Sequence, residues 1–262
     1  MFKTAVVFTA LAATAVASCK DAILPLAVGD TGSCLSITDL LPLMSADGSL
    51  VQPLDTYLSK LCSNSTPGCS NDTLSSAKSS LEKGCAEDMK NPTSPATILI
   101  SVIDSYDNIY AAACSKNSTT SKFCVTETLE TLQTDTNNNI TLAYLSGILG
   151  GDTSSFAALE QSFQSGHMCT SCVAGIYYEA TQINSTLTNT VVGSAVVGQC
   201  GADFGKSGPT DVTVQKPGAA SGAVPGETTT SLKNGALSYS LAPFAVVGAS
   251  VVAVFIGAAS VF

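Results

Sequence analysis

Apolar residues recur at steps of three and four positions along most of the chain between residues 36 and 200. Val51, Leu54, Leu58 and Leu61 form one such stripe, which is typical of an amphipathic helix. Similar stripes follow at residues 74–85, 99–113, 125–132, 140–149, 156–163 and 173–183. Residues 191–197 fit a strand or a helix, and no segment shows a comparable strand-like alternation. The pattern predicts an all-α fold.

Two helix starts carry capping signals. Ser94 followed by Pro95 is a cap with a first-turn proline, and it opens a single long helix that we expect to end near Cys114. Asn71 or Asp72 is expected to cap the helix that carries the 74–85 stripe.

The N-terminus has the layout of a secretory signal peptide, which we assign to residues 1–18. Lys3 precedes an apolar run at 5–16, and small residues at Ala15 and Ala17 predict cleavage after Ala17 or Ser18. Val16-Ala17-Ser18-Cys19 also resembles a lipobox, in which Cys19 would be acylated. Acylation would leave an odd number of cysteines in an oxidising compartment, which favours the signal peptide.

An even number of cysteines predicts five disulfides in a compact, disulfide-stapled helical domain over residues 19–204. The short intervals between Cys62 and Cys69, and between Cys114 and Cys124, indicate local bridges. The ten cysteines are Cys19, Cys34, Cys62, Cys69, Cys85, Cys114, Cys124, Cys169, Cys172 and Cys200.

Sequons for N-glycosylation agree with secretion, and each predicts an asparagine that faces solvent. They lie at Asn64, Asn71, Asn117, Asn139 and Asn184.

The C-terminal part changes composition. Residues 205–240 are rich in Gly, Pro, Ser and Thr and predict a disordered stalk. Residues 241–262 end in an uninterrupted apolar stretch from 244, with no basic residue after it. A removable GPI signal with Asn234 as the attachment site fits this layout better than a retained transmembrane helix. Gly222 and Ser221 are alternative attachment sites.

The charge pattern excludes nucleic acid as a partner. The chain is 45% apolar and 12% charged, with a net charge of −9 and no arginine. An acidic surface without guanidinium groups repels polyanions.

Candidate chemical motifs are few, and we predict no enzyme activity, cofactor or metal. Cys169 and Cys172, beside His167, resemble half a zinc or redox motif, but the other ligands or the βαβ context that such sites need are absent. Disulfide ends are the better interpretation. Asp135 opens a segment like a calcium loop, yet the required glycine and final glutamate are missing.

Paired carboxylates are the remaining candidates for acid–base chemistry. Asp104 and Asp107 lie one turn apart opposite an apolar stripe, and Glu127 and Glu130 repeat this spacing. Such residues are expected on a solvated face. We also expect Asp104, Asp107 and His167 to lack the partners that catalysis requires.

The order of the cysteines and their neighbours resembles one known family. The matching segments are Leu61-Cys62, Cys69 to Leu74, Leu81, Cys85, Tyr106, Cys114, Phe123 to Leu129, and Cys169 to Cys172. They are similar to a fungal family of secreted, cysteine-rich, often GPI-anchored proteins that is known as a domain of unknown function. The resemblance covers most of Cys34–Cys200. It implies a helical, disulfide-bonded ectodomain and carries over no catalytic residue.

These features predict a non-catalytic, structural or adhesive protein at the outer face of the plasma membrane or in the cell wall. Its expected partners are the membrane, through a GPI lipid or the apolar tail, and cell-wall polysaccharide or surface proteins. The alternative is a binding module whose apolar groove takes a lipid, sterol or peptide. Tyr106, Tyr110, Tyr177 and Tyr178 are the candidate lining residues.

Overall fold

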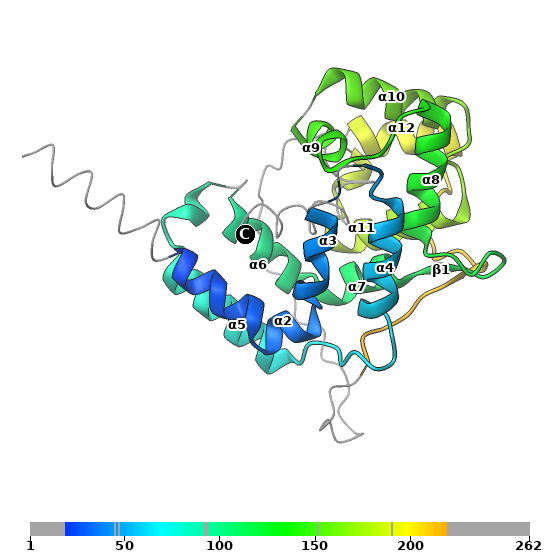
Figure 1. Cartoon of the computed structure of the whole chain (residues 1–262). Coiled ribbons are helices and arrows are strands. Elements are labelled where there is room, and N and C mark those ends of the chain that lie inside the picture. Colours follow the sequence, from blue (N-terminus) through cyan, green and yellow to red (C-terminus); the bar gives the residue numbers. More distant parts are fainter. Residues whose placement is uncertain are drawn as a thin grey trace, which may run out of the picture.

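The computed structural model describes residues 19–44, 46, 48–91, 94–150, 152–189 and 191–218, and within them it confirms the predicted all-α fold. Residues 19–28 are helical, and one short antiparallel strand pair joins β1 to β2 (Figure 1). The elements that follow residue 28 are α2 (Asp30–Cys34), η1 (Ile37–Leu40), α3 (Leu41–Met44), α4 (Val51–Leu61), α5 (Asn71–Gly84), η2 (Asp88–Lys90), α6 (Pro95–Asp104), α7 (Tyr106–Cys114), β1 (Lys116–Asn117), α8 (Cys124–Thr136), α9 (Leu142–Gly150), α10 (Thr153–Gln164), α11 (Ser171–Ile183), η3 (Leu187–Asn189), α12 (Val191–Cys200) and β2 (Val212–Thr213).

The largest core lies among α4, α7, α8 and α11, which we call the main bundle. α7 and α8 pack along α11, and α4 covers α8. The predicted stripes supply the buried side chains: Leu58 is fully buried on α4, and Leu129 and Leu132 are buried on α8. Burial of large aliphatic and aromatic side chains is the main source of stability in such a bundle.

A second, smaller core forms the N-terminal unit, which consists of helix 19–28, α5 and α6. In Figure 1 the dark-blue helix 19–28 lies along α5, apart from the green and yellow helices α8 to α12. Its buried residues are Cys19, Ile23, Ala77, Leu81, Cys85, Ala96, Ile100 and Ile103. Leu24 and Val28 on the outer side of helix 19–28 stay exposed.

A third cluster joins α10, α11 and α12. Phe163, Tyr177 and Val196 are buried in it, and Phe204 packs against it. Residues 191–197, which fitted a strand or a helix by sequence, form helix α12.

The predicted long helix from Ser94 to Cys114 is wrong, because it breaks at Ser105 into α6 and α7. Its two halves serve different cores. Ile100 and Ile103 of α6 are buried in the N-terminal unit, whereas Tyr106 and Tyr110 of α7 are buried in the main bundle. The start is as predicted, since Ser94 accepts a hydrogen bond from the Thr97 backbone N–H at 3.2 Å and Pro95 is the first helical residue.

The cap of α5 also differs from the prediction. Ser70, rather than Asn71 or Asp72, accepts a hydrogen bond from the Thr73 backbone N–H at 3.1 Å. Asn71 is therefore the first residue of the helix and its side chain is exposed.

The first part of the predicted stalk, residues 205–218, contacts the helical domain. Residues 205–218 follow the surface of the helical domain, and β2 pairs with β1 in the register Lys116 to Thr213 and Asn117 to Val212. The backbone N–H of Gly68 also donates to the Gly218 carbonyl at 3.0 Å. The ordered domain thus extends at least to residue 218, and the rest of the predicted stalk lies outside the described residues.

Candidate functional site

The disulfide framework pairs all ten cysteines, which confirms five bridges. The local bridges that we predicted are wrong, because each bridge joins distant segments and the shortest interval is 31 residues. The pairs are Cys19–Cys85, Cys34–Cys69, Cys62–Cys114, Cys124–Cys172 and Cys169–Cys200. Cys69 lies two residues before α5 and Cys124 is the first residue of α8, and each is bonded to a cysteine of another helix, Cys34 of α2 and Cys172 of α11.

Cys169 and Cys172 do not form a joint site, because each is paired with a different cysteine. Within the described ranges, the one cluster with metal-ligand spacing is Cys19, Cys85 and Asp88. Its two sulfurs are bonded to each other and offer no thiolate. The pairing of Cys169 with Cys200 and of Cys172 with Cys124 confirms the disulfide interpretation of the motif.

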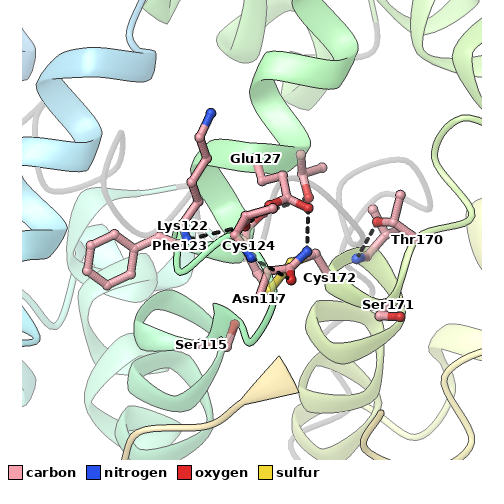
Figure 2. The surroundings of a disulfide bond; sticks show 12 residues. Ser115, Asn117, Lys122, Phe123, Cys124, Glu127, Thr170, Ser171 and Cys172 are labelled. Atoms are coloured by element: carbon pink, nitrogen blue, oxygen red, sulfur yellow. Dashed lines mark hydrogen bonds between the residues drawn. A yellow bond between two sulfur atoms is a disulfide. The ribbon is translucent and has the colours of Figure 1, made fainter. Parts of the chain in front are cut away.

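Polar side chains concentrate around the Cys124–Cys172 bridge, where residues 115–124 form a hairpin at the start of α8 (Figure 2). The Cys124 backbone N–H donates to the Ser115 carbonyl at 2.8 Å, and the Asn117 N–H donates to the Lys122 carbonyl at 3.0 Å. Ser121 closes the turn with a positive φ of 59°. The Lys116 ammonium lies 4.3 Å from the centre of the buried Phe123 ring.

The Asn117 side chain is held on both of its polar atoms. Its Nδ2 donates to Glu127 Oε1 at 2.8 Å, and its Oδ1 accepts from the Thr119 backbone N–H at 2.9 Å. Thr120 completes the contact, since its hydroxyl donates to the other Glu127 oxygen at 2.7 Å. Figure 2 shows the Asn117 amide pointing at this carboxylate. Glu127 is thus a structural partner of the hairpin instead of the solvated residue that we expected.

The predicted glycosylation sites differ in exposure. Asn64, Asn71 and Asn139 are exposed, whereas Asn117 and Asn184 are half-buried. Asn184 is the C-cap residue of α11, and its Oδ1 accepts from the backbone N–H and the hydroxyl of Thr186 at 3.0 and 2.7 Å. Of the five sequon asparagines, Asn117 is the one whose Nδ2 donates a hydrogen bond to another residue in the described part of the chain.

A Ser–Asp–His cluster was missed at the sequence level. Asp135 Oδ1 lies 2.8 Å from His167 Nδ1, and the Ser162 hydroxyl donates to Asp135 Oδ2. Partial burial pushes the pKa of Asp135 upward, but the hydrogen bonds from Ser162 and His167 outweigh it and leave the pKa below its usual value. The separation of 32 residues between Asp135 and His167 left no signal in the sequence.

The arrangement of this cluster fits a structural tie. The serine hydroxyl bonds to the carboxylate, whereas a nucleophilic serine must bond to the imidazole. The buried Ser162 and the largely buried Asp135 therefore join α10 to the end of α8, and His167 covers them with 64% of its side chain exposed. His167 thus has a hydrogen-bond partner in Asp135 that the sequence did not indicate. Asp135, the first residue of the calcium-like segment, is hydrogen-bonded to both of these side chains.

The other carboxylates lie on the surface, as expected. Asp104 is exposed and pairs with Lys78 of α5 at 2.6 Å, so it too has a partner that we did not foresee. Asp107 is exposed at the start of α7. Glu130 pairs with Lys122 at 2.6 Å, and this contact, through the hydrogen bond first and the negative charge second, raises the pKa of Lys122.

Three of the four tyrosines proposed to line a groove are buried in the cores. Tyr106 and Tyr110 are buried, and their hydroxyls bond to the Cys69 backbone N–H at 3.0 Å and the Leu61 carbonyl at 3.3 Å. Tyr177 is buried beside Phe204, and Tyr178 is half-buried. Burial raises the pKa of Tyr106 to about 12. A neutral, buried phenol with a backbone partner is a packing element of the core.

Comparison with known protein families gives one match, and it spans residues 33–208 of the 262-residue chain. The matching family is described as Domain of unknown function (DUF7729). The chain belongs to this family. The match starts just before Cys34 and ends beyond Cys200, so the DUF7729 domain includes nine of the ten half-cystines that the structure pairs, with Cys19 outside it. No curated protein and no solved structure matches the chain.

The domain match confirms the predicted domain of unknown function, while fungal origin and the lipid anchor stay predictions. None of the helices in the described segments combines the length and apolar character that a membrane-spanning segment needs. The signal peptide, Asn234 and the apolar tail at 244–262 lie outside the described residues. The five disulfides fit an extracellular or secreted protein.

Proposed function

We propose that this DUF7729 protein is a non-catalytic, N-glycosylated domain that a GPI anchor displays on the cell surface or in the cell wall, with a structural or adhesive role. The observation that carries the proposal is the pairing of all ten cysteines, including Cys19 directly after the predicted cleavage site. Disulfides persist in oxidising compartments, and five of them suit a domain that must keep its shape outside the cell.

Several surface features support a passive role. The polar clusters at Glu127 and Asp135 connect elements of the fold, and the Ser162 hydroxyl bonds to the Asp135 carboxylate, not to the His167 imidazole. The exposed sequons at Asn64, Asn71 and Asn139 would surround the domain with glycans. Glycans provide solubility to a chain in which only 12% of residues are charged.

The test follows the protein on intact eukaryotic cells. Phosphatidylinositol-specific phospholipase C should release the wild-type chain, and Asn234→Phe should reduce its surface display. Gly222→Phe is the matched control, because it changes the alternative attachment site in the same segment. Retention after lipase treatment, with the apolar tail found by mass spectrometry, would contradict the anchor.

A second measurement tests the disulfides and the glycans of the released protein. Under denaturing, non-reducing conditions no cysteine should react with an alkylating reagent. Removal of N-glycans should lower the apparent mass. Free Cys169 and Cys172, found together, would revive a metal or redox role for the protein.

A further inference from the structure

Asn117 differs from the other sequon asparagines because its amide is part of the fold. Its Nδ2 donates to Glu127, and its Oδ1 accepts from the backbone N–H groups of Thr119 and Thr120 at 2.9 and 3.3 Å. By contrast, Asn139 is exposed, and its side chain makes no hydrogen bond to any residue that the structure describes. The side-chain amide that receives the glycan is therefore hydrogen-bonded at Asn117 and free of such bonds to the described residues at Asn139.

Glycan transfer needs this amide in a free state. The Asn Nδ2 attacks the anomeric carbon of an oligosaccharide carried on a polyprenyl diphosphate. A carbon–nitrogen bond forms, the bond from that carbon to the diphosphate oxygen breaks, and the diphosphate leaves with the electron pair. Nδ2 gives up one of its two protons to the departing diphosphate or to water. A nitrogen that already donates to a half-buried carboxylate must first break that charge-assisted hydrogen bond.

We propose that folding of the 115–124 hairpin closes the Asn117 sequon, so that a competition between folding and transfer sets its occupancy. The proposal rests on the proposed function, because it requires a secreted glycoprotein. Glycan transfer at Asn117 is then partial, whereas Asn139 is filled.

The order of the chain supports such a competition. Glu127 follows Asn117 by ten residues, so the hairpin and the first turn of α8 close by local contacts soon after synthesis. A second closure comes later, when Asn117 pairs with Val212 and the Ser118 backbone N–H donates to the Asp211 carbonyl at 2.9 Å. Two disulfides, from Cys114 and Cys124, then fix both ends of the hairpin.

The test measures the occupancy of each sequon by mass spectrometry, after enzymatic deglycosylation of the secreted full-length chain in isotope-labelled water. We expect lower occupancy at Asn117 than at Asn139 in the wild type. Glu127→Ala removes both acceptors and should raise occupancy at Asn117 severalfold without a change at Asn139. Glu130→Ala is the matched control, because it removes a carboxylate that contacts the same hairpin only through Lys122.

If the Glu127→Ala variant is not secreted, a second experiment on the wild-type protein tests the same proposal. A brief pulse of reducing agent during synthesis delays the bridges of Cys114 and Cys124, and it should raise occupancy at Asn117 selectively. Equal, high occupancy of Asn117 and Asn139 in untreated wild type would overturn the proposal, as would no rise at Asn117 in either arm. If no sequon carries a glycan, the proposed function fails instead.

Discussion

The N-terminal unit and the main bundle are two helical cores of one chain, but they differ in what stabilises them. The main bundle buries large side chains such as Leu58, Tyr110 and Leu129. The core of the N-terminal unit includes two alanines and the Cys19–Cys85 bridge, and its outer helix leaves Val28 78% exposed. Because a small core buries little apolar surface, it depends more on its disulfide.

Few connections link the N-terminal unit to the main bundle. The helix breaks at Ser105, the Cys34–Cys69 bridge connects α2 to the segment before α5, and Leu74 packs against both cores. Elements with separate cores and few shared residues can open separately. The comparison therefore predicts that the N-terminal unit opens at a lower free energy than the main bundle.

The largest expected effect comes from a matched pair of leucines. Leu58 of the main bundle and Leu81 of the N-terminal unit are both fully buried. Leu58→Ala should lower the global free energy of unfolding by about 2–5 kcal/mol, because it leaves a cavity in the larger core. Leu81→Ala should lower mainly the free energy at which helix 19–28 and α5 open.

Denaturant titration combined with amide hydrogen exchange separates the two outcomes. In the Leu81→Ala variant, exchange should accelerate in helix 19–28 and α5, while α4 and α8 keep their protection. A single transition in which both variants lose the same free energy at every probe would show that the chain unfolds as one cooperative unit.

Sequence periodicity was sufficient to predict the helices but not how they associate. The apolar stripe continues from Leu99 through Tyr106 to Ala113, and nothing local reveals that Ser105 separates two cores. The stripe records only that one face is buried, whereas the break depends on which distant helices cover that face. For the same reason residues 191–197 stayed ambiguous until their packing against η3 was known.

The disulfide pairing and the polar ties depend on contacts over long intervals in the sequence. Short spacing suggested a Cys62–Cys69 bridge, but Cys62 lies at the end of α4, next to the end of α7, and pairs with Cys114. The Asn117–Glu127 contact is a local one that the sequence could have suggested, because the sequon lies only ten residues before the acidic first turn of a helix. The link between Asp135 and His167 was not, since it needs the fold of α10.

A smaller effect is expected at Tyr106, which lies where the two cores meet. Tyr106→Phe removes the hydrogen bond from the Cys69 backbone N–H and should cost about 0.5–1.5 kcal/mol at neutral pH. Burial raises the pKa of this phenol from 10.0 in the unfolded chain to about 12. The folded state therefore favours the protonated form, and this stability is complete below pH 10 and is lost as the pH rises toward 12.

Denaturant titrations across this alkaline range test the tyrosine. The wild type should lose on the order of 2 kcal/mol through Tyr106 by pH 12, and Tyr106→Phe should lack this part of the decline. Tyr178→Phe is the matched control, because Tyr178 is half-buried and its hydroxyl bonds to no residue in the described part of the chain. Parallel alkaline curves for the wild type and Tyr106→Phe would contradict the assignment.

The smallest effect is expected from the ion pair inside the N-terminal unit. Lys78 of α5 contacts both carboxylate oxygens of Asp104 on α6, at 2.6 and 2.8 Å, and about a third of each side chain is exposed. Asp104→Asn should lower the free energy at which this unit opens by about 0.2–1 kcal/mol, because solvent screens a pair at the surface. Asp107→Asn, which changes an exposed carboxylate outside any ion pair of the described residues, should stay within about 0.5 kcal/mol of the wild type. Salt of about 1 M should remove the difference between the two variants, since it shortens the screening length to about 3 Å. A loss that persists in salt, or that spreads to the exchange of α4 and α8, would mean that the pair couples the N-terminal unit to the main bundle and that the two cores are not independent.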